Sequence, residues 1–174
     1  MIGGARRSSF WWILVGVVVL DYATKLLAVA GLSRVPVPVL GDWLSLRLVY
    51  NPGAAFGIYL GAYSRWIFTA LALIALVVLG EMVRKTKPGE HFRLVALALV
   101  CGGAVGNLVD RFRSARGVVD FIDVWIGSFH WPTFNVADMA VSCGAIALAV
   151  VLWNEGRHDE SAVAEQADVA EVSP

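Results

Sequence analysis

Four long runs of hydrophobic residues divide the chain, and polar residues gather where these runs end. The runs cover about residues 10–30, 63–83, 92–110 and 133–153. A helix that crosses the hydrocarbon core of a bilayer needs about 20 predominantly apolar residues. The uncharged part of each run is somewhat shorter, so polar residues are expected inside the ends of each spanning helix. The pattern predicts an all-α membrane protein with four transmembrane helices.

The composition fits a membrane protein. Hydrophobic residues make up 58% of the chain and charged residues 16%, whereas soluble domains average about 45–50% and about 25%. The formal net charge is zero and no basic arm is present, so a nucleic-acid partner is not expected. We expect residues 1–157 to form a single integral-membrane domain. Residues 158–174 are acidic and rich in alanine, which predicts a disordered cytoplasmic tail.

The first hydrophobic run has two interpretations. Arg6 and Arg7, an apolar stretch and then Ala-Val-Ala at residues 28–30 are also typical of a cleavable secretory signal. Asp21 and Lys25, however, interrupt the segment between the apolar stretch and the alanines. They are four residues apart and therefore share one face of a helix. We favour a retained membrane helix.

The segment between the first two runs, residues 31–62, has a different pattern. Leucine or tyrosine occupies every second position from Leu44 to Tyr50, which predicts a short strand or hairpin at the membrane interface. We therefore expect a small extracytoplasmic β-rich segment between the first two helices. The loop around Phe56 is a candidate lid, although the Asn-Pro-Gly before it is also an ordinary turn. Residues 111–132 are expected to form a loop.

The orientation of the chain depends mainly on one basic cluster. The short loop RKTKPGEHFR, residues 84–93, is the most concentrated group of basic residues. Loops rich in Lys and Arg tend to remain in the cytoplasm. This places both termini and the 84–93 loop inside, and residues 31–62 and 112–132 outside.

Seven polar side chains are expected to meet at the outer end of the bundle. In an up-and-down arrangement, the ends of helices one and three lie beside the beginnings of helices two and four. The residues are Asp21, Lys25, Asn107, Asp110, Arg111, Asn135 and Asp138. Such groups are costly within a membrane, so they indicate a functional site. Gly102 and Gly106 form a GxxxG pattern that lets a neighbouring helix approach closely.

The available chemistry is that of carboxyl groups. The three histidines are scattered and the chain has no HExxH motif, so no metal or other cofactor is expected. Cys101 and Cys143 lie in apolar runs and are interpreted as small buried hydrophobic residues. Two adjacent aspartates share a proton and can act as base and acid.

Three classes of function remain open on this basis. They are a hydrolase with an aspartate pair, a proton-coupled transporter and a structural scaffold. A transporter would place polar residues near the membrane midplane and usually has inverted repeats, and the sequence has no internal repeat. A scaffold leaves the paired aspartates unexplained.

Five sequence blocks resemble one known family. They are DYATK (21–25), NPGAAFG (51–57), GGAVGNLVDR (102–111), VVDF (118–121) and FNVAD (134–138). In this order, and on four hydrophobic runs, they resemble bacterial lipoprotein signal peptidase, also called signal peptidase II. The resemblance extends from the first run through the fourth, and the chain after about residue 155 lies outside it.

The resemblance implies an activity and a location. It implies an intramembrane aspartic endopeptidase that removes the signal peptide from diacylglyceryl-modified prolipoproteins, cutting just before the lipidated cysteine. The enzyme would be a multi-pass protein of the bacterial inner membrane with its active site toward the extracytoplasmic face. Its partners would be the lipid-modified prolipoprotein and membrane phospholipid, and a monomer is expected.

The resemblance also assigns residues. Asp120 in VVDF and Asp138 in FNVAD match the catalytic pair. The supporting or substrate-binding residues would be Asp21, Lys25, Asn51, Gly53, Asn107, Asp110, Arg111 and Asn135. Arg111 has two open roles, since its charge can meet substrate or lipid or can pair with Asp110. Asp123 lies outside the blocks and is expected to be a solvated loop residue whose substitution is nearly silent.

Overall fold

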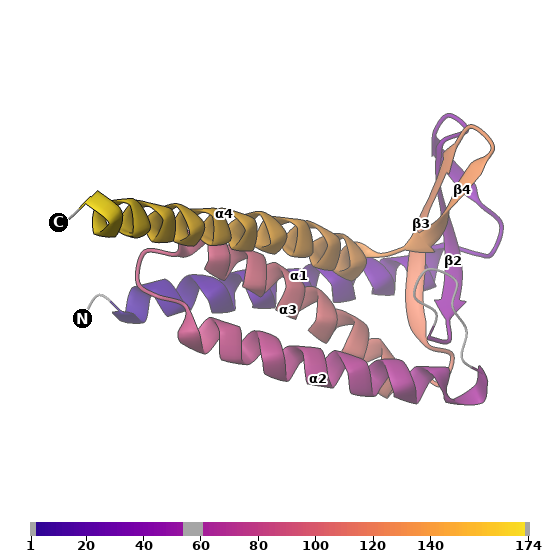
Figure 1. Ribbon diagram of the computed structural model, residues 1–174. Helices are drawn as coiled ribbons and strands as arrows, with labels where there is room; N and C mark the ends of the chain where they lie inside the picture. The colour runs from indigo at the N-terminus through magenta and orange to yellow at the C-terminus, as the bar shows by residue number, and fades with distance from the viewer. Residues whose placement is uncertain (1–2, 54–60, 173–174) are drawn as a thin grey trace.

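Four helices lie side by side along most of the length of the molecule (Figure 1). The computed structural model describes residues 3–53 and 61–172, so the candidate lid around Phe56 lies outside the described residues. The helices are α1 (Gly3–Gly31), α2 (Ser64–Lys85), α3 (His91–Arg113) and α4 (Val136–Val172).

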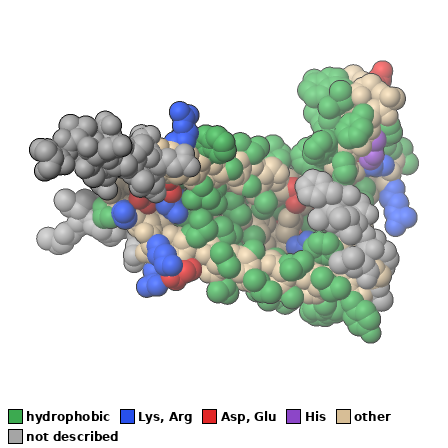
Figure 2. All heavy atoms as spheres, viewed as in Figure 1, with side chains coloured by type: hydrophobic (Ala, Val, Ile, Leu, Met, Phe, Trp, Pro, Cys, Tyr) green, Lys and Arg blue, Asp and Glu red, His purple; other side chains and the backbone are tan. Residues whose placement is uncertain are grey.

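Each helix contains a stretch that is long and apolar enough to cross a membrane, as the hydrophobic pattern predicts. The stretches are Ser8–Gly31, Ser64–Lys85, His91–Arg113 and Val136–Arg157. Hydrophobic side chains cover the middle of the helical body, while basic and acidic side chains gather at the end that carries the termini (Figure 2). The backbone of α4 remains helical beyond Arg157 to Val172. The disorder of the 158–174 tail stays a prediction.

A four-stranded antiparallel sheet lies across the other end of the bundle (Figure 1). Its strands, in spatial order, are β1 (Val37–Leu40), β2 (Leu44–Asn51), β3 (Val118–Ile126) and β4 (Phe129–Phe134). The strands β1 and β2 confirm the predicted β-rich segment between the first two helices. A short 3-10 helix (Gly61–Tyr63) leads from this region into α2.

The prediction of a loop over residues 111–132 is wrong, because most of this segment forms β3 and the start of β4. The first four residues of β3 are all buried. A strand that is covered on both faces has no alternation of polar and apolar residues. The hydrophobic pattern therefore carries no period-two signal for β3.

Helix α3 is the centre of the bundle and packs against the other three helices. Its glycines make this possible. A Cβ atom at Gly102 would lie 2.9 Å from Val17 Cβ, and one at Gly106 would lie 2.7 Å from Asp21 Oδ2. Both glycines therefore face α1, which confirms the close approach that the GxxxG pattern predicts.

Candidate active site

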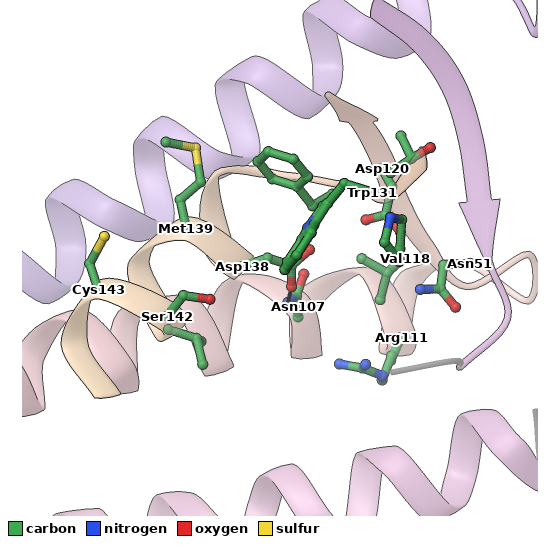
Figure 3. Close-up of a pocket in the computed structure, with 14 residues that line it drawn as sticks. Asn51, Asn107, Arg111, Val118, Asp120, Trp131, Asp138, Met139, Ser142 and Cys143 are labelled. Carbon is green, nitrogen blue, oxygen red and sulfur yellow. Dashed lines mark hydrogen bonds between the residues drawn. The ribbon is translucent and has the colours of Figure 1, made fainter. Parts of the chain in front are cut away.

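A cavity of about 560 Å³ opens where the sheet meets the bundle. Residues of β2, β3, β4, α3 and α4 line it (Figure 3). Its polar lining consists mainly of Asn51, Asn107, Arg111, Asp120 and Asp138. Trp131, Pro132, Phe134, Met139 and Val141 supply apolar lining. The cavity thus combines two carboxyl groups with an apolar wall that continues along the first turns of α4.

Asp138 lies in the first turn of α4 and takes part in a reciprocal cap. The backbone N–H of Asp138 donates to Asn135 Oδ1 at 2.9 Å, and the backbone N–H of Asn135 donates to Asp138 Oδ2 at 3.2 Å. This is a capping box with Asn135 as the N-cap residue. The positive end of the helix dipole favours negative charge at this position. Asp138 is therefore held in a setting that suits a carboxylate.

Asp120 lies on β3 and is buried, with only 2% of its surface exposed. Asn135 Nδ2 donates a hydrogen bond to Asp120 Oδ1 at 2.7 Å, and the Asn51 side chain is a further partner. Burial and then the charge of Asp138 raise the pKa of Asp120 to about 7, although both hydrogen bonds act in the opposite direction. The two carboxyl groups of the cavity therefore have different surroundings.

Asn107 connects the two carboxyl groups, and Lys25 fixes the orientation of its amide. Lys25 Nζ donates to Asn107 Oδ1 at 3.0 Å. Because an ammonium group can only donate, the atom of Asn107 that faces Lys25 must be the oxygen. The amide nitrogen is left to donate to Asp138 Oδ1 at 2.8 Å. The same oxygen of Asn107 also accepts from Asn135 Nδ2 at 3.2 Å.

Lys25 of α1 is buried and forms two ion pairs, one within α1 and one with α3. Its Nζ lies 2.7 Å from Asp21 Oδ2 and 2.9 Å from Asp110 Oδ2. The free oxygen of Asp21 accepts from the backbone N–H of Ala137 at 2.9 Å, and Asp110 Oδ2 accepts from that of Val119 at 3.2 Å. This cluster joins α1 and α3 to the segments that carry both cavity aspartates.

Arg111 lines the same cavity as Asp120 and Asp138 (Figure 3). Its Nε atom is buried and has no hydrogen-bond partner among the described residues. Asp110 pairs with Lys25, and no Asp110–Arg111 ion pair is found in the described part of the chain. Of the two open roles, the geometry therefore favours a charge that faces the cavity.

Residues 13–154 match the family described as signal peptidase (SPase) II. The chain belongs to this family. A lipoprotein signal peptidase of Hydrogenovibrio crunogenus is 43% identical over 155 residues, which cover 87% of this chain and 89% of the relative. A lipoprotein signal peptidase of Pseudomonas aeruginosa is 39% identical over 160 residues, which cover 90% of this chain and 94% of the relative.

Solved structures match the chain over most of its length. A bacterial membrane enzyme determined by the in meso method at 1.9 Å resolution matches with a TM-score of 0.74 and 32% identity, over 83% of this chain and 92% of that chain. A second, determined at 2.3 Å, matches with a TM-score of 0.77 and 31% identity, over 86% and 90%. The family resemblance is thereby confirmed, and members of the signal peptidase II family process prolipoproteins.

Most of the residues expected in a signal peptidase II site come together in the structure. Gly53, whose backbone N–H donates to Asn51 Oδ1 at 3.1 Å, does not itself line the cavity. Its φ is +114°, and a Cβ atom there would lie 2.9 Å from backbone atoms of Ser64 and Arg65. This glycine therefore lets the end of β2 pack against the start of α2.

Two expectations about single residues are wrong. Cys143 is exposed and lines the cavity, whereas Cys101 is buried as expected. Asp123 is completely buried on β3 instead of solvated. The apolar wall from β4, which includes Trp131 and Phe134, was not expected either. Its signal in the sequence is the two aromatic residues Trp131, just before FNVAD, and Phe134, the first residue of that block.

Proposed function

We propose that this member of the signal peptidase II family is an aspartic endopeptidase that cuts diacylglyceryl-modified prolipoproteins just before the lipidated cysteine. The observation that supports this is the pair Asp120 and Asp138 in one cavity with an apolar wall. Met139 and Cys143 extend this lining along α4, within a stretch apolar enough to cross a membrane. A lipid chain can therefore lie against this wall while the peptide meets the carboxyl groups.

In the proposed mechanism, Asp138 is the base and Asp120 is the acid. The Asp138 carboxylate takes a proton from water as the water oxygen attacks the scissile carbonyl carbon, and Asp120 gives its proton to the carbonyl oxygen. Protonated Asp138 then gives its proton to the amide nitrogen while the C–N bond breaks. Asp120 recovers a proton from the hydroxyl group, which leaves a carboxylic acid and a free amine.

The surroundings of the two groups support this division of roles. Asp138 accepts hydrogen bonds from Asn107 and from the cap of α4. The raised pKa of Asp120, which results mainly from burial, keeps a proton available near neutral pH. Arg111 adds a positive charge on the cavity wall, where it can face the peptide carbonyl or the lipid ester. The active site is proposed to face the extracytoplasmic side.

The test is cleavage of a diacylglyceryl-modified precursor by purified protein. We expect the wild-type protein to release the signal peptide. Asp120→Asn and Asp138→Asn should each lower the rate by about three powers of ten or more, as expected for members of one catalytic unit. Asparagine is nearly isosteric with aspartate but cannot exchange the proton.

Thermal melting of each purified variant is the control for folding. Substantial cleavage by a folded Asp120→Asn or Asp138→Asn variant would remove that residue from the mechanism. If the wild-type protein releases no signal peptide from this precursor, the proposed substrate is wrong.

A further inference from the structure

Asp123 is a completely buried carboxyl group outside the cavity, and it receives hydrogen bonds from three strands. On Oδ1 it accepts from Arg47 Nη2 at 2.8 Å, His130 Nε2 at 2.8 Å and Thr133 Oγ1 at 3.0 Å. On Oδ2 it accepts from Ser45 Oγ at 3.2 Å and Trp125 Nε1 at 3.1 Å. Such a set of donors is more than a solvated loop residue would have. It indicates a role for this carboxylate within the sheet.

Both strands that flank β3 have an irregular register close to Asp123, in β2 opposite Phe121 and in β4 opposite Asp123 itself. Between β2 and β3, Leu46 pairs with Ile122 but Val49 pairs with Asp120, so β2 contains one extra residue. Between β3 and β4, Ile122 pairs with Phe134 but Val124 pairs with Trp131, so β4 also contains one extra residue. These are β-bulges, in which ladder hydrogen bonds are interrupted.

The donors to Asp123 come from the bulged stretches themselves. Arg47 lies in the stretch of β2 between Leu46 and Val49, and Thr133 lies in the stretch of β4 between Trp131 and Phe134. Arg47 Nη2 also donates directly to Thr133 Oγ1 at 2.9 Å. The three side chains therefore connect the two bulges across β3.

The charge of Asp123 is suited to this role. Burial acts to raise the pKa of Asp123, but hydrogen bonds from His130, Thr133 and Trp125 outweigh it, with Arg47 adding to their effect, and lower the pKa. Asp123 therefore remains a carboxylate near neutral pH. As a carboxylate it accepts from every neighbour, which an amide of the same size cannot do.

The two bulges set how the strands meet the cavity. Bulges next to active sites re-aim side chains and are built into a fold for that purpose. Beyond its bulge, β2 carries Asn51, which lines the cavity and is a partner of Asp120. In and beyond its bulge, β4 carries Thr133 and Phe134, which line the cavity. A shift of either strand would move part of the surface that meets substrate.

We propose that Asp123 is a positioning residue for substrate binding, which acts by holding the bulged strands β2 and β4 in register around the cavity. This inference rests on the proposed function, because the cavity is taken as the substrate site. Asp138, by contrast, is held by Asn107 and by the cap of α4. Asp120 keeps its hydrogen bond from Asn135, at the start of α4, even if Asn51 shifts. Loss of the Asp123 carboxylate should therefore weaken binding more than the chemical step.

The first experiment compares Asp123→Asn with Asp42→Asn, an exposed aspartate in the turn between β1 and β2 of the same sheet. Cleavage of a diacylglyceryl-modified precursor peptide in detergent gives kcat and KM. We expect KM to rise by about tenfold or more in Asp123→Asn, as for a displaced binding surface, with a much smaller change in kcat. Asp42→Asn should match the wild-type protein.

The second experiment uses Arg47→Met, because Arg47 does not line the cavity. It should raise KM in the same direction as Asp123→Asn. If both residues act through one network, the double variant should be no worse than the more affected single variant. Arg47→Lys keeps the cation and should recover part of the lost affinity. Binding alone is measured in a background in which Asp138→Asn blocks cleavage. The Kd of the precursor is compared between the Asp138→Asn variant and the double variant that also carries Asp123→Asn.

The outcomes separate this inference from the proposed function. Wild-type protein that does not cleave the precursor would refute the proposed function. Cleavage by wild-type protein together with an unchanged KM in folded Asp123→Asn would refute the role of Asp123, as would additive effects of the two substitutions. If Asp123→Asn does not fold, Ser45→Ala decides by the same measurements, since it removes a single donor and should raise KM to a smaller extent.

Discussion

At the scale of single residues, the protonation of Asp120 links the site to the stability of the protein. The pKa of Asp120 is raised to about 7, mainly by burial, whereas an aspartate in an unfolded chain has a pKa of about 3.9. Between these values the folded protein keeps a proton that the unfolded chain has released. The free energy of unfolding therefore falls as the pH rises through this window.

We expect this effect in thermal melting of the purified protein in detergent. From about pH 4 to about pH 7, the melting temperature of the wild-type protein should fall relative to that of Asp120→Asn, because the variant has no proton to lose at this site. Other acidic groups titrate in the same range, so the difference between the two curves is the quantity that matters. Parallel curves would show that Asp120 titrates like an ordinary carboxyl group.

The sequence predicts the polar residues of the helices better than those of the sheet. Asp21 and Lys25 are identifiable because a charge within an apolar run is costly and needs a partner. Asp123 has no such signal. Its burial depends on bulges in β2 and β4, and a bulge shifts the alternation of faces along a strand. Nothing in the residues around Asp123 alone reveals that two neighbouring strands supply its donors.

At the scale of elements, α3 and α4 approach each other closely at Gly103. A Cβ atom at this position would lie 2.7 Å from Val141 Cγ2 and would also meet the backbone of α4. The first turn of α4 carries Asp138, so the distance between these two helices affects the site directly. Gly80 of α2 provides a contrast, because a Cβ atom there would meet nothing within 4 Å.

Gly103→Ala should therefore lower stability by about 1–3 kcal/mol, the usual effect of overpacking, and should reduce cleavage by displacing α4. Gly80→Ala adds the same methyl group in open space and should leave both properties nearly unchanged. Thermal melting and the cleavage assay measure the two effects. Equal behaviour of the two variants would mean that the contact between α3 and α4 adapts without cost.

The elements also differ in how far the sequence predicts them. All four helices follow from runs of apolar residues, and the apolar stretch within each helix begins and ends close to the predicted residues. The strand β2 follows from alternation over Leu44–Asn51. The strands β3 and β4 do not, since β3 is buried on both faces in its first half and β4 contains a proline.

At the scale of the whole molecule, the two ends of the bundle differ in character. The sheet and the cavity occupy one end, and both termini and the connection from α2 to α3 occupy the other (Figure 1). Arg84 and Lys85 in the last turn of α2 and Lys87 in the connection make this end basic. Arg93 of α3 also lies here and pairs with Glu155 of α4 at 2.9 Å. The tendency of basic loops to remain inside predicts a cytoplasmic location for this end.

Cysteine labelling tests this orientation in intact cells. In a Cys101→Ser, Cys143→Ser background, which removes the exposed thiol of Cys143, single Lys87→Cys and Arg116→Cys substitutions place one thiol at each end of the bundle. Both native side chains are exposed. We expect a membrane-impermeant thiol reagent to label position 116 from outside and position 87 only after the cells are lysed. Labelling of position 87 in intact cells would invert the topology and would place the cavity on the cytoplasmic side, where an exported lipoprotein precursor could not reach it after translocation.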